Sequence, residues 1–181
     1  MEYEIKPAAG FRLGFSELWQ YRELFYFFTW RDIRIKYKQA VLGIAWCILQ
    51  PVLMLAVFSI VFGEGFGMKG KDTSLPYPVF VFSGLLFWNI FSTGLSGASN
   101  SMVANANMIK KIYFPRLIIP VSAVLVSVFD FLMVLIVFVM TMWFYGVSFN
   151  VSQPFWLLVS LLLTVLSTLG LGAWMAALNV K

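Results

Sequence analysis

The hydrophobic and polar positions of this chain alternate on the scale of whole membrane spans. Apolar runs cover about residues 40–62, 78–104, 117–145 and 154–178, and short polar segments separate them. A helix needs about 20 predominantly apolar residues to cross a hydrocarbon core of roughly 30 Å. The pattern therefore predicts an all-α polytopic membrane protein with four transmembrane helices, which form one transmembrane domain over residues 40–178.

The segment before the first span has a different pattern. Residues 1–14 are mixed in character, and Ser16 is a candidate N-cap for the helix that follows. Apolar side chains then recur at helical spacing on one side, at Leu18, Tyr21, Phe25 and Phe28. We interpret residues 1–39 as a cytoplasmic arm followed by an amphipathic helix at the membrane interface, with aromatic residues at headgroup depth. A packed helix of a soluble cap is the alternative.

Composition narrows the class further. Of 181 residues, 61% are hydrophobic and 12% are charged, whereas a soluble domain carries about 25% charged residues. The chain contains no histidine and one cysteine, which excludes most acid–base dyads, most zinc sites and a disulfide framework. The basic residues cluster at predicted membrane edges, so the net charge of +5 does not indicate nucleic-acid binding.

Positive charge predicts the orientation of the chain. The basic residues on one side are Lys6, Arg12, Arg22, Arg31, Arg34, Lys36 and Lys38 before the first span, Lys110, Lys111 and Arg116 between the second and third, and Lys181 at the end. The opposite side carries Lys69 and Lys71, balanced by Glu64 and Asp72. Loops rich in Lys and Arg stay in the cytoplasm. We therefore expect both ends of the chain to be cytoplasmic.

Two polar positions lie inside the predicted spans. The pair Gln50-Pro51 falls in the middle of the first span, where proline usually kinks a helix. Asp130 falls near the middle of the third span, where an acid costs about 3 kcal/mol on insertion scales. Asn89 and Ser92 of the second span fall at a similar depth and are candidate partners. Asp130 then either lines a hydrated path or makes an interhelical hydrogen bond.

Two short patterns resemble known sites without the residues that those sites need. Residues 65–71 match the first seven places of a phosphate-binding P-loop, but Asp72 stands where Ser or Thr should reach magnesium. Gly94-Leu-Ser-Gly97 resembles the GxSG of rhomboid intramembrane proteases. Those enzymes use a Ser–His dyad, and this chain has no histidine. Neither pattern predicts a site here.

Two longer stretches carry a family resemblance. RDIRIKYKQAVLGIAWCILQPVLML, from Arg31, resembles the entry into the first span of ABC-2 type permeases. MIKKIYFPRLIIPVSAVLVSVFDF, from Met108, resembles the segment that joins their second and third spans. The KKIYFPR element is most similar to the polysaccharide-export branch, which carries O-antigen, capsule and teichoic acid. The resemblance covers most of the chain from about Ser16 onward.

The resemblance implies a function and a set of partners. The chain would be the permease subunit of an exporter of polyprenyl-diphosphate-linked glycan in the bacterial cytoplasmic (inner) membrane. It would form a homodimer, contact membrane lipid and pair with ATP-binding cassette ATPase subunits, which would hold ATP and Mg²⁺. It would itself be no enzyme and carry no cofactor or metal. Family members have six spans, so four spans imply a chain truncated after the fourth.

The resemblance also implies residue roles. Residues 18–29 would lie in the interface helix, and residues 105–116, here called the coupling segment, would contact the ATPase through Asn107, Met108, Ile109, Lys110, Lys111, Ile112, Tyr113 and Phe114. Cations at the inner interface could bind the lipid diphosphate, or could only fix the topology and touch anionic lipid; they are Arg31, Arg34, Lys36 and Lys38. Candidates for the translocation path are Gln50, Phe87, Trp88, Asn89, Phe91 and Asp130.

Three other functions stay open at this point. An ABC-2 type exporter of small lipophilic molecules or drugs would need less of a hydrated path. A membrane enzyme such as a glycosyltransferase would need a catalytic acid or a metal site, and Asp130 is the only acid within a predicted span. A non-transporting scaffold would not require an ATPase partner.

Overall fold

A computed structural model of the chain describes residues 21–37, 40–65, 75–111, 114–147 and 153–179. Every regular element in these ranges is a helix, as the apolar pattern predicts. The elements are α2 (Arg22–Tyr37), α3 (Ala40–Phe58), the π-helix η1 (Ser59–Gly65), α4 (Tyr77–Ala104), α5 (Ala106–Ile109), α6 (Ile118–Phe144) and α7 (Gln153–Leu178). The predicted arm, the candidate cap Ser16 and residues 66–74 lie outside the described ranges.

Three helices in the described residues are long and apolar enough to cross a membrane. They span Tyr77–Ala104, Ile118–Phe144 and Pro154–Leu178, close to the second, third and fourth predicted spans. The first predicted span corresponds to α3 and η1, where the apolar helical stretch Ile48–Gly63 is shorter. Pro51 lies inside α3, and the helix passes into π-helical geometry after Phe58. The count of four spans stays a prediction.

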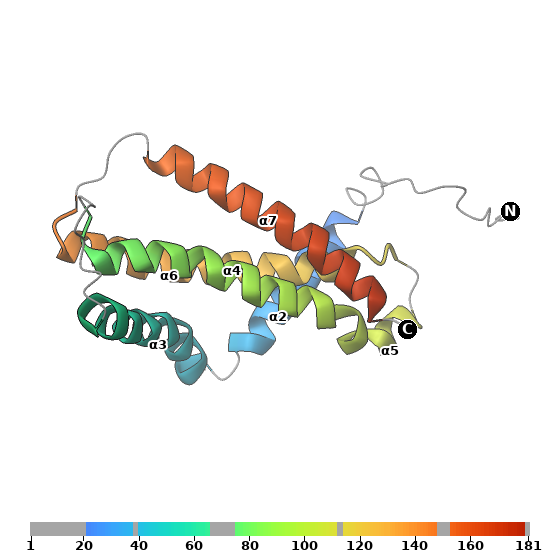
Figure 1. Cartoon of the computed structure of the whole chain (residues 1–181). Helices are drawn as coiled ribbons and strands as arrows, with labels where there is room; N and C mark the ends of the chain where they lie inside the picture. The colour runs from blue at the N-terminus through green and yellow to red at the C-terminus, as the bar shows by residue number, and fades with distance from the viewer. Residues whose placement is uncertain (1–20, 38–39, 66–74, 112–113, 148–152, 180–181) are drawn as a thin grey trace, which may run out of the picture.

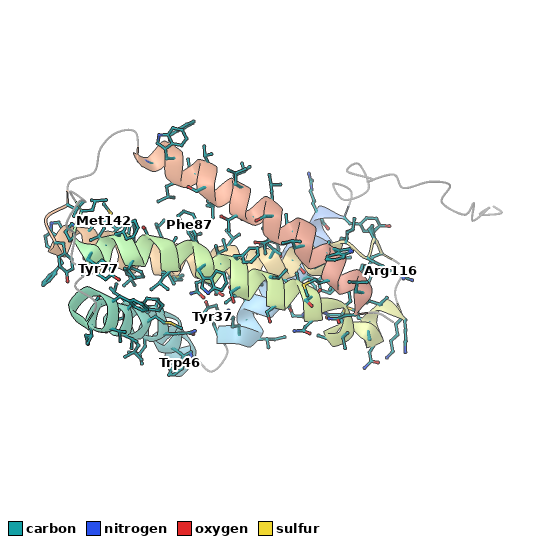
Figure 2. The ribbon with its side chains drawn as sticks, in the orientation of Figure 1. Tyr37, Trp46, Tyr77, Phe87, Arg116 and Met142 are labelled. Atoms are coloured by element: carbon teal, nitrogen blue, oxygen red, sulfur yellow. The ribbon has the colours of Figure 1, made fainter. Side chains whose placement is uncertain are left out.

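The helices form an antiparallel bundle around α4 and α6 (Figure 1). Helix α7 packs against α4 most closely near its C-terminal end, and α3 lies on another side of the bundle. Tyr77 and Met142 mark one end of the bundle, and Arg116 marks the opposite end (Figure 2). The basic coupling segment therefore lies at the end away from the start of α4.

The core between α4 and α6 consists of two matching apolar stripes. On α4 they are Val79, Phe82, Leu86 and Ile90; on α6 they are Phe131, Val134, Phe138 and Met142. Both stripes follow the helical spacing of three and four residues, which keeps the side chains on one face. The rings of Phe82 and Phe138 meet edge to face with centroids 5.7 Å apart. The pairing fixes the antiparallel register of the two helices.

Further along α4, the packing changes from large to small side chains. A Cβ atom on Gly94 would lie 2.7 Å from Ser127 Oγ and 2.8 Å from Thr168 Cγ2. A Cβ atom on Gly172 would lie 2.7 Å from Ala98 Cβ. In a membrane, small residues allow helix backbones to approach closely, and dispersion contacts then stabilise the bundle. Helices α4, α6 and α7 meet at this point.

Large apolar side chains cover much of the outer surface, as a lipid solvent allows. At the end of the bundle opposite Arg116, the exposed aromatic residues are Trp143, Phe144, Tyr145, Phe155 and Trp156. Trp and Tyr are enriched at membrane–water interfaces, where an amphipathic ring is favoured. This cluster indicates an aromatic belt at that end of α6 and α7.

The close approach at Gly172 predicts a selective loss of stability. Gly172→Ala should lower the free energy of unfolding by about 1–3 kcal/mol, because the new methyl group overpacks against a short side chain that cannot turn away. Gly170→Ala is the matched control, since a Cβ atom at that position would have no neighbour within 4 Å. Thermal unfolding of the purified protein in detergent measures both. Equal melting temperatures for the two variants would contradict the packing described.

Candidate functional site

Asp130 is the centre of a polar cluster between α2 and α6. It lies near the middle of the 27-residue α6, and its side chain is 9% exposed. Lys36 Nζ forms an ion pair with Asp130 Oδ2, and the Tyr37 hydroxyl donates a hydrogen bond to Oδ1. Each carboxylate oxygen therefore has a donor, which offsets the cost of burying the acid. Both donors come from the last turn of α2.

This arrangement differs from the expected partners of Asp130. The similar depth of Asn89 and Ser92 pointed to α4, but both side chains line a cavity toward α3. Helix α2 instead packs against α6, with Phe28 buried on Ile118 and Ile119. The face predicted from helical spacing contributes to this contact, since Tyr21 and Phe25 pack on the same cluster. The packed face brings the end of α2 to Asp130.

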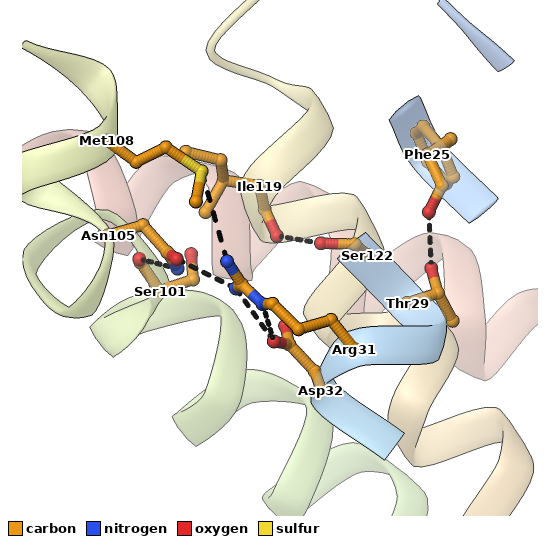
Figure 3. Close-up of polar contacts among 9 residues, drawn as sticks. All are labelled: Phe25, Thr29, Arg31, Asp32, Ser101, Asn105, Met108, Ile119 and Ser122. Atoms are coloured by element: carbon orange, nitrogen blue, oxygen red, sulfur yellow. Dashed lines mark hydrogen bonds and ion pairs between the residues drawn. The ribbon is translucent and has the colours of Figure 1, made fainter. Parts of the chain in front are cut away.

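A second polar cluster, the Arg31 network, consists of Arg31, Asp32, Asn105 and Met108 (Figure 3). Arg31 Nε and Nη2 donate to Asp32 Oδ1 at 2.9 and 2.7 Å, and Nη2 also donates to Asn105 Oδ1 at 2.8 Å. Nη1 lies 3.9 Å from Met108 Sδ. The Asn105 amide nitrogen donates in turn to the Ser101 carbonyl at 2.9 Å, which fixes the amide orientation. The network joins α2 to the start of the coupling segment.

A cavity of about 610 Å³, the α2 cavity, opens between α2, α4 and α6. Both polar clusters border it, and its polar lining includes Arg31, Asp32, Lys36, Asn100, Asn105 and Asp130. The two cations are each paired with a carboxylate, Arg31 with Asp32 and Lys36 with Asp130. The charges of the lining therefore cancel in pairs, and the amide of Asn100 adds a neutral polar group.

A second cavity of about 450 Å³, the α3 cavity, lies between α3 and α4. Its polar lining consists of Gln50, Asn89, Ser92 and Thr93, and Trp88 adds an aromatic ring. Thr93 lines both cavities, so the two follow one another along α4. Amide and hydroxyl groups beside an indole ring can hydrogen-bond hydroxyl-rich ligands and stack on their apolar faces.

The structure divides the path candidates among three places. Gln50, Trp88 and Asn89 come together at the α3 cavity, and Phe91 lies beside Trp88 with ring centroids 6.2 Å apart. Asp130 lines the α2 cavity. Phe87 instead packs on Phe131, with centroids 5.8 Å apart, at the edge of the core.

The four interface cations also have different surroundings. Arg31 and Lys36 are paired with acids, as described. Arg34 is exposed, and its guanidinium carbon lies 5.3 Å from the centroid of the Trp30 ring, within cation–π range. Lys38 lies outside the described residues. Arg31 and Lys36 thus each contact a carboxylate, whereas the contact described for Arg34 is with an aromatic ring.

The coupling segment has a packed side and an exposed side. Met108 and Ile109 pack on the cluster of Phe28 and Phe114, and Phe114 is buried. The exposed positions among its described residues are Asn107, Lys110, Lys111 and Arg116. Ile112 and Tyr113 lie outside the described residues. The arrangement holds the segment against α2 while it presents two lysines at the surface.

The fold, with its long apolar helices and a polar track along one face of α4, is that of a helical membrane protein. A family profile described as ABC-2 type transporter matches residues 23–181, and the chain belongs to that family.

Named relatives narrow the comparison to polysaccharide export. The chain is 28% identical over 152 residues to the O-antigen export system permease protein RfbA of Klebsiella pneumoniae, which covers 84% of this chain and 57% of that protein. It is 29% identical over 168 residues to the protein of the same name from Myxococcus xanthus, and the match covers 91% of this chain and 61% of that protein. It is 23% identical over 142 residues to the polysialic acid transport protein KpsM of Escherichia coli, and the match covers 78% of this chain and 54% of that protein. The chain thus spans a little over half the length of these relatives.

The buried acid predicts an asymmetric response to mutation of the ion pair. Lys36→Met should lower the free energy of unfolding by about 1–2 kcal/mol, because it leaves a buried carboxylate with one donor; a fully buried pair would lose about 3–5 kcal/mol. Asp130→Asn should cost less, since the half-exposed lysine can turn to water.

A double-mutant cycle in thermal unfolding tests this prediction. The variant with both substitutions should be destabilised by less than the sum of the single effects. Arg34→Met is the matched control, because it also removes an exposed cation from α2, and it should change stability by no more than about 0.5 kcal/mol. Additive effects of the two substitutions would show that the pair contributes nothing.

Proposed function

We propose that the chain belongs to the membrane-spanning permease of an ABC exporter that moves a lipid-linked polysaccharide of the O-antigen, capsule or teichoic acid type across the bacterial cytoplasmic membrane. The observation that carries this proposal is the set of relatives, whose names specify O-antigen export and polysialic acid transport. ATP and Mg²⁺ would bind to a partner ATPase, and two permease copies would form the complete channel.

The polar track along α4 supports this proposal. Trp88 offers a surface on which a sugar ring can stack, and Gln50 and Asn89 can exchange hydrogen bonds with sugar hydroxyls. Thr93 continues the track from the α3 cavity to the α2 cavity. We assign Gln50, Trp88, Asn89 and Phe91 to the lining of the path.

The proposed topology has four spans, with α3 and η1 as the first, and places both ends of the chain in the cytoplasm. The arrangement of charge supports it, since Arg116 and the exposed Lys110 and Lys111 gather at one end of the bundle. An aromatic belt marks the other end. Of the three described interface cations, Arg34 is best suited to attract a lipid diphosphate, because Arg31 and Lys36 already pair with acids.

Depletion of the full-length protein in its host tests the proposed function. Polyprenyl-diphosphate-linked glycan should build up on the cytoplasmic face of the membrane, and the surface polymer should disappear. Extraction of that glycan from sealed vesicles measures the first pool, and staining of the cell surface measures the second. If both pools stay unchanged while resistance to lipophilic compounds falls, the protein exports small molecules and the polysaccharide assignment is wrong.

Charge reversal in the coupling segment tests the proposed contact with the ATPase. Lys110→Glu with Lys111→Glu should reduce glycan export about tenfold or more while the protein still inserts. The substitutions replace two exposed positive charges by negative charges, which would be repelled by an ATPase surface that attracts the lysines. Lys69→Glu with Lys71→Glu is the matched control, because the proposed topology puts these two lysines on the opposite side of the membrane. Normal export by the Lys110/Lys111 variant would place the ATPase contact elsewhere.

A further inference from the structure

We propose that Arg31 is a positioning residue that joins the coupling segment to α2, so that a displacement of the segment by the ATPase moves α2 with it. The inference rests on the proposed function, because it assumes an ATPase partner. It assigns Arg31 a mechanical role in place of binding the lipid diphosphate.

The first support is the occupancy of the guanidinium group. All three Arg31 nitrogens have a partner: Asp32 for Nε, Asp32 and Asn105 for Nη2, and Met108 for Nη1. The group also lies over the Phe28 ring, 4.8 Å from its centroid. Its charge is balanced by Asp32, and its side chain is 24% exposed. An arginine held in this way has little left to offer an anion.

The second support is where these contacts fall. Asn105 lies between α4 and α5, and Met108 lies within α5, so Arg31 reaches the first part of the coupling segment. Phe28, about one turn earlier on α2, packs on Phe114 with ring centroids 5.6 Å apart. Helix α2 therefore contacts both the beginning and the end of the coupling segment. The first contact is a polar network, and the second is an apolar contact between aromatic rings.

The third support is what α2 contacts beyond this region. Lys36 and Tyr37 hold its last turn on Asp130, in the middle of α6. Arg31 and Lys36 lie on one continuous helix, Arg22–Tyr37, and a helix of this length moves as a rigid element. A chain of contacts thus runs from the coupling segment through Arg31 and α2 to the wall of the α2 cavity.

The choice of variants separates a link from an anion site. Arg31→Lys keeps the positive charge but loses the planar fork that bridges Asp32 and Asn105. Asn105→Ala leaves the charge of Arg31 intact and removes one end of the bridge. Asn105→Asp loses the donor to the Ser101 carbonyl but keeps an acceptor for the guanidinium, and the charge-assisted hydrogen bond should preserve the link to Arg31. Arg22→Lys repeats the arginine substitution on α2 about two and a half turns earlier, as the matched control.

The experiment reconstitutes the full-length permease with its ATPase and counts glycans exported per ATP hydrolysed. Arg31→Lys and Asn105→Ala should each lower this ratio about fivefold, and the combination should be no worse than the stronger single variant. Asn105→Asp and Arg22→Lys should keep the wild-type ratio. Normal export by both Arg31→Lys and Asn105→Ala would overturn the proposal. That result is expected if Arg31 binds an anion through its charge alone, or if it has no role in export.

A merely structural role would give another pattern, which also overturns the proposal. ATP hydrolysis and export would then fall in proportion, and the ratio would not change. A double-mutant cycle on the melting temperature needs no substrate, and additive shifts would show that Arg31 and Asn105 are not linked. A wild-type complex that hydrolyses ATP but exports no glycan would instead refute the proposed function, and with it the transmission role, whatever the cycle shows.

Discussion

A carboxylate buried half-way along a membrane-length helix constrains how the rest of this chain can pack. Asp130 is surrounded by apolar turns of α6 and has to find donors that reach its depth. Lys36 and Tyr37 supply them from the last turn of α2. This requirement explains why α2 packs along α6 with Phe28 buried.

Helix α4 packs into the core of the bundle with one face and borders the two cavities with another. One face carries the apolar stripe from Val79 to Ile90, which packs on α6 and fixes the register. Gly94 and Ala98 continue that packing toward α6 and α7 through close contacts. Other polar positions, among them Asn89 and Thr93, border the two cavities. The same helix can therefore hold the bundle together and present hydrogen-bonding groups along a track.

The sequence predicted the elements of this fold better than their contacts. Spans follow from the length of apolar runs, and α4, α6 and α7 begin and end within about one residue of the expected limits. Helical spacing also predicted the packed face of α2 at Phe25 and Phe28. The predicted pairing of Asp130 with Asn89 was wrong, because it compared only the positions of the two residues along the membrane normal. Such a comparison does not show which helices are neighbours. Two features of the sequence together could have indicated Lys36: Asp130 is the only acid within a predicted span, and a cluster of basic residues directly precedes the first span. Aromatic character likewise does not distinguish a ring that packs at the edge of the core, as Phe87 does on Phe131, from a ring at a cavity.

The central claim is that α2 and the coupling segment move as one body. Pulsed electron spin resonance on the full-length complex measures it most directly, with labels at the exposed positions Ile35 on α2, Asn107 in the coupling segment and Met140 on α6. On addition of ATP, the distance between Ile35 and Asn107 should stay constant while the distance between Asn107 and Met140 changes. A change in the distance between Ile35 and Asn107 as large as that between Asn107 and Met140 would show that the segment moves without α2, and would contradict this account.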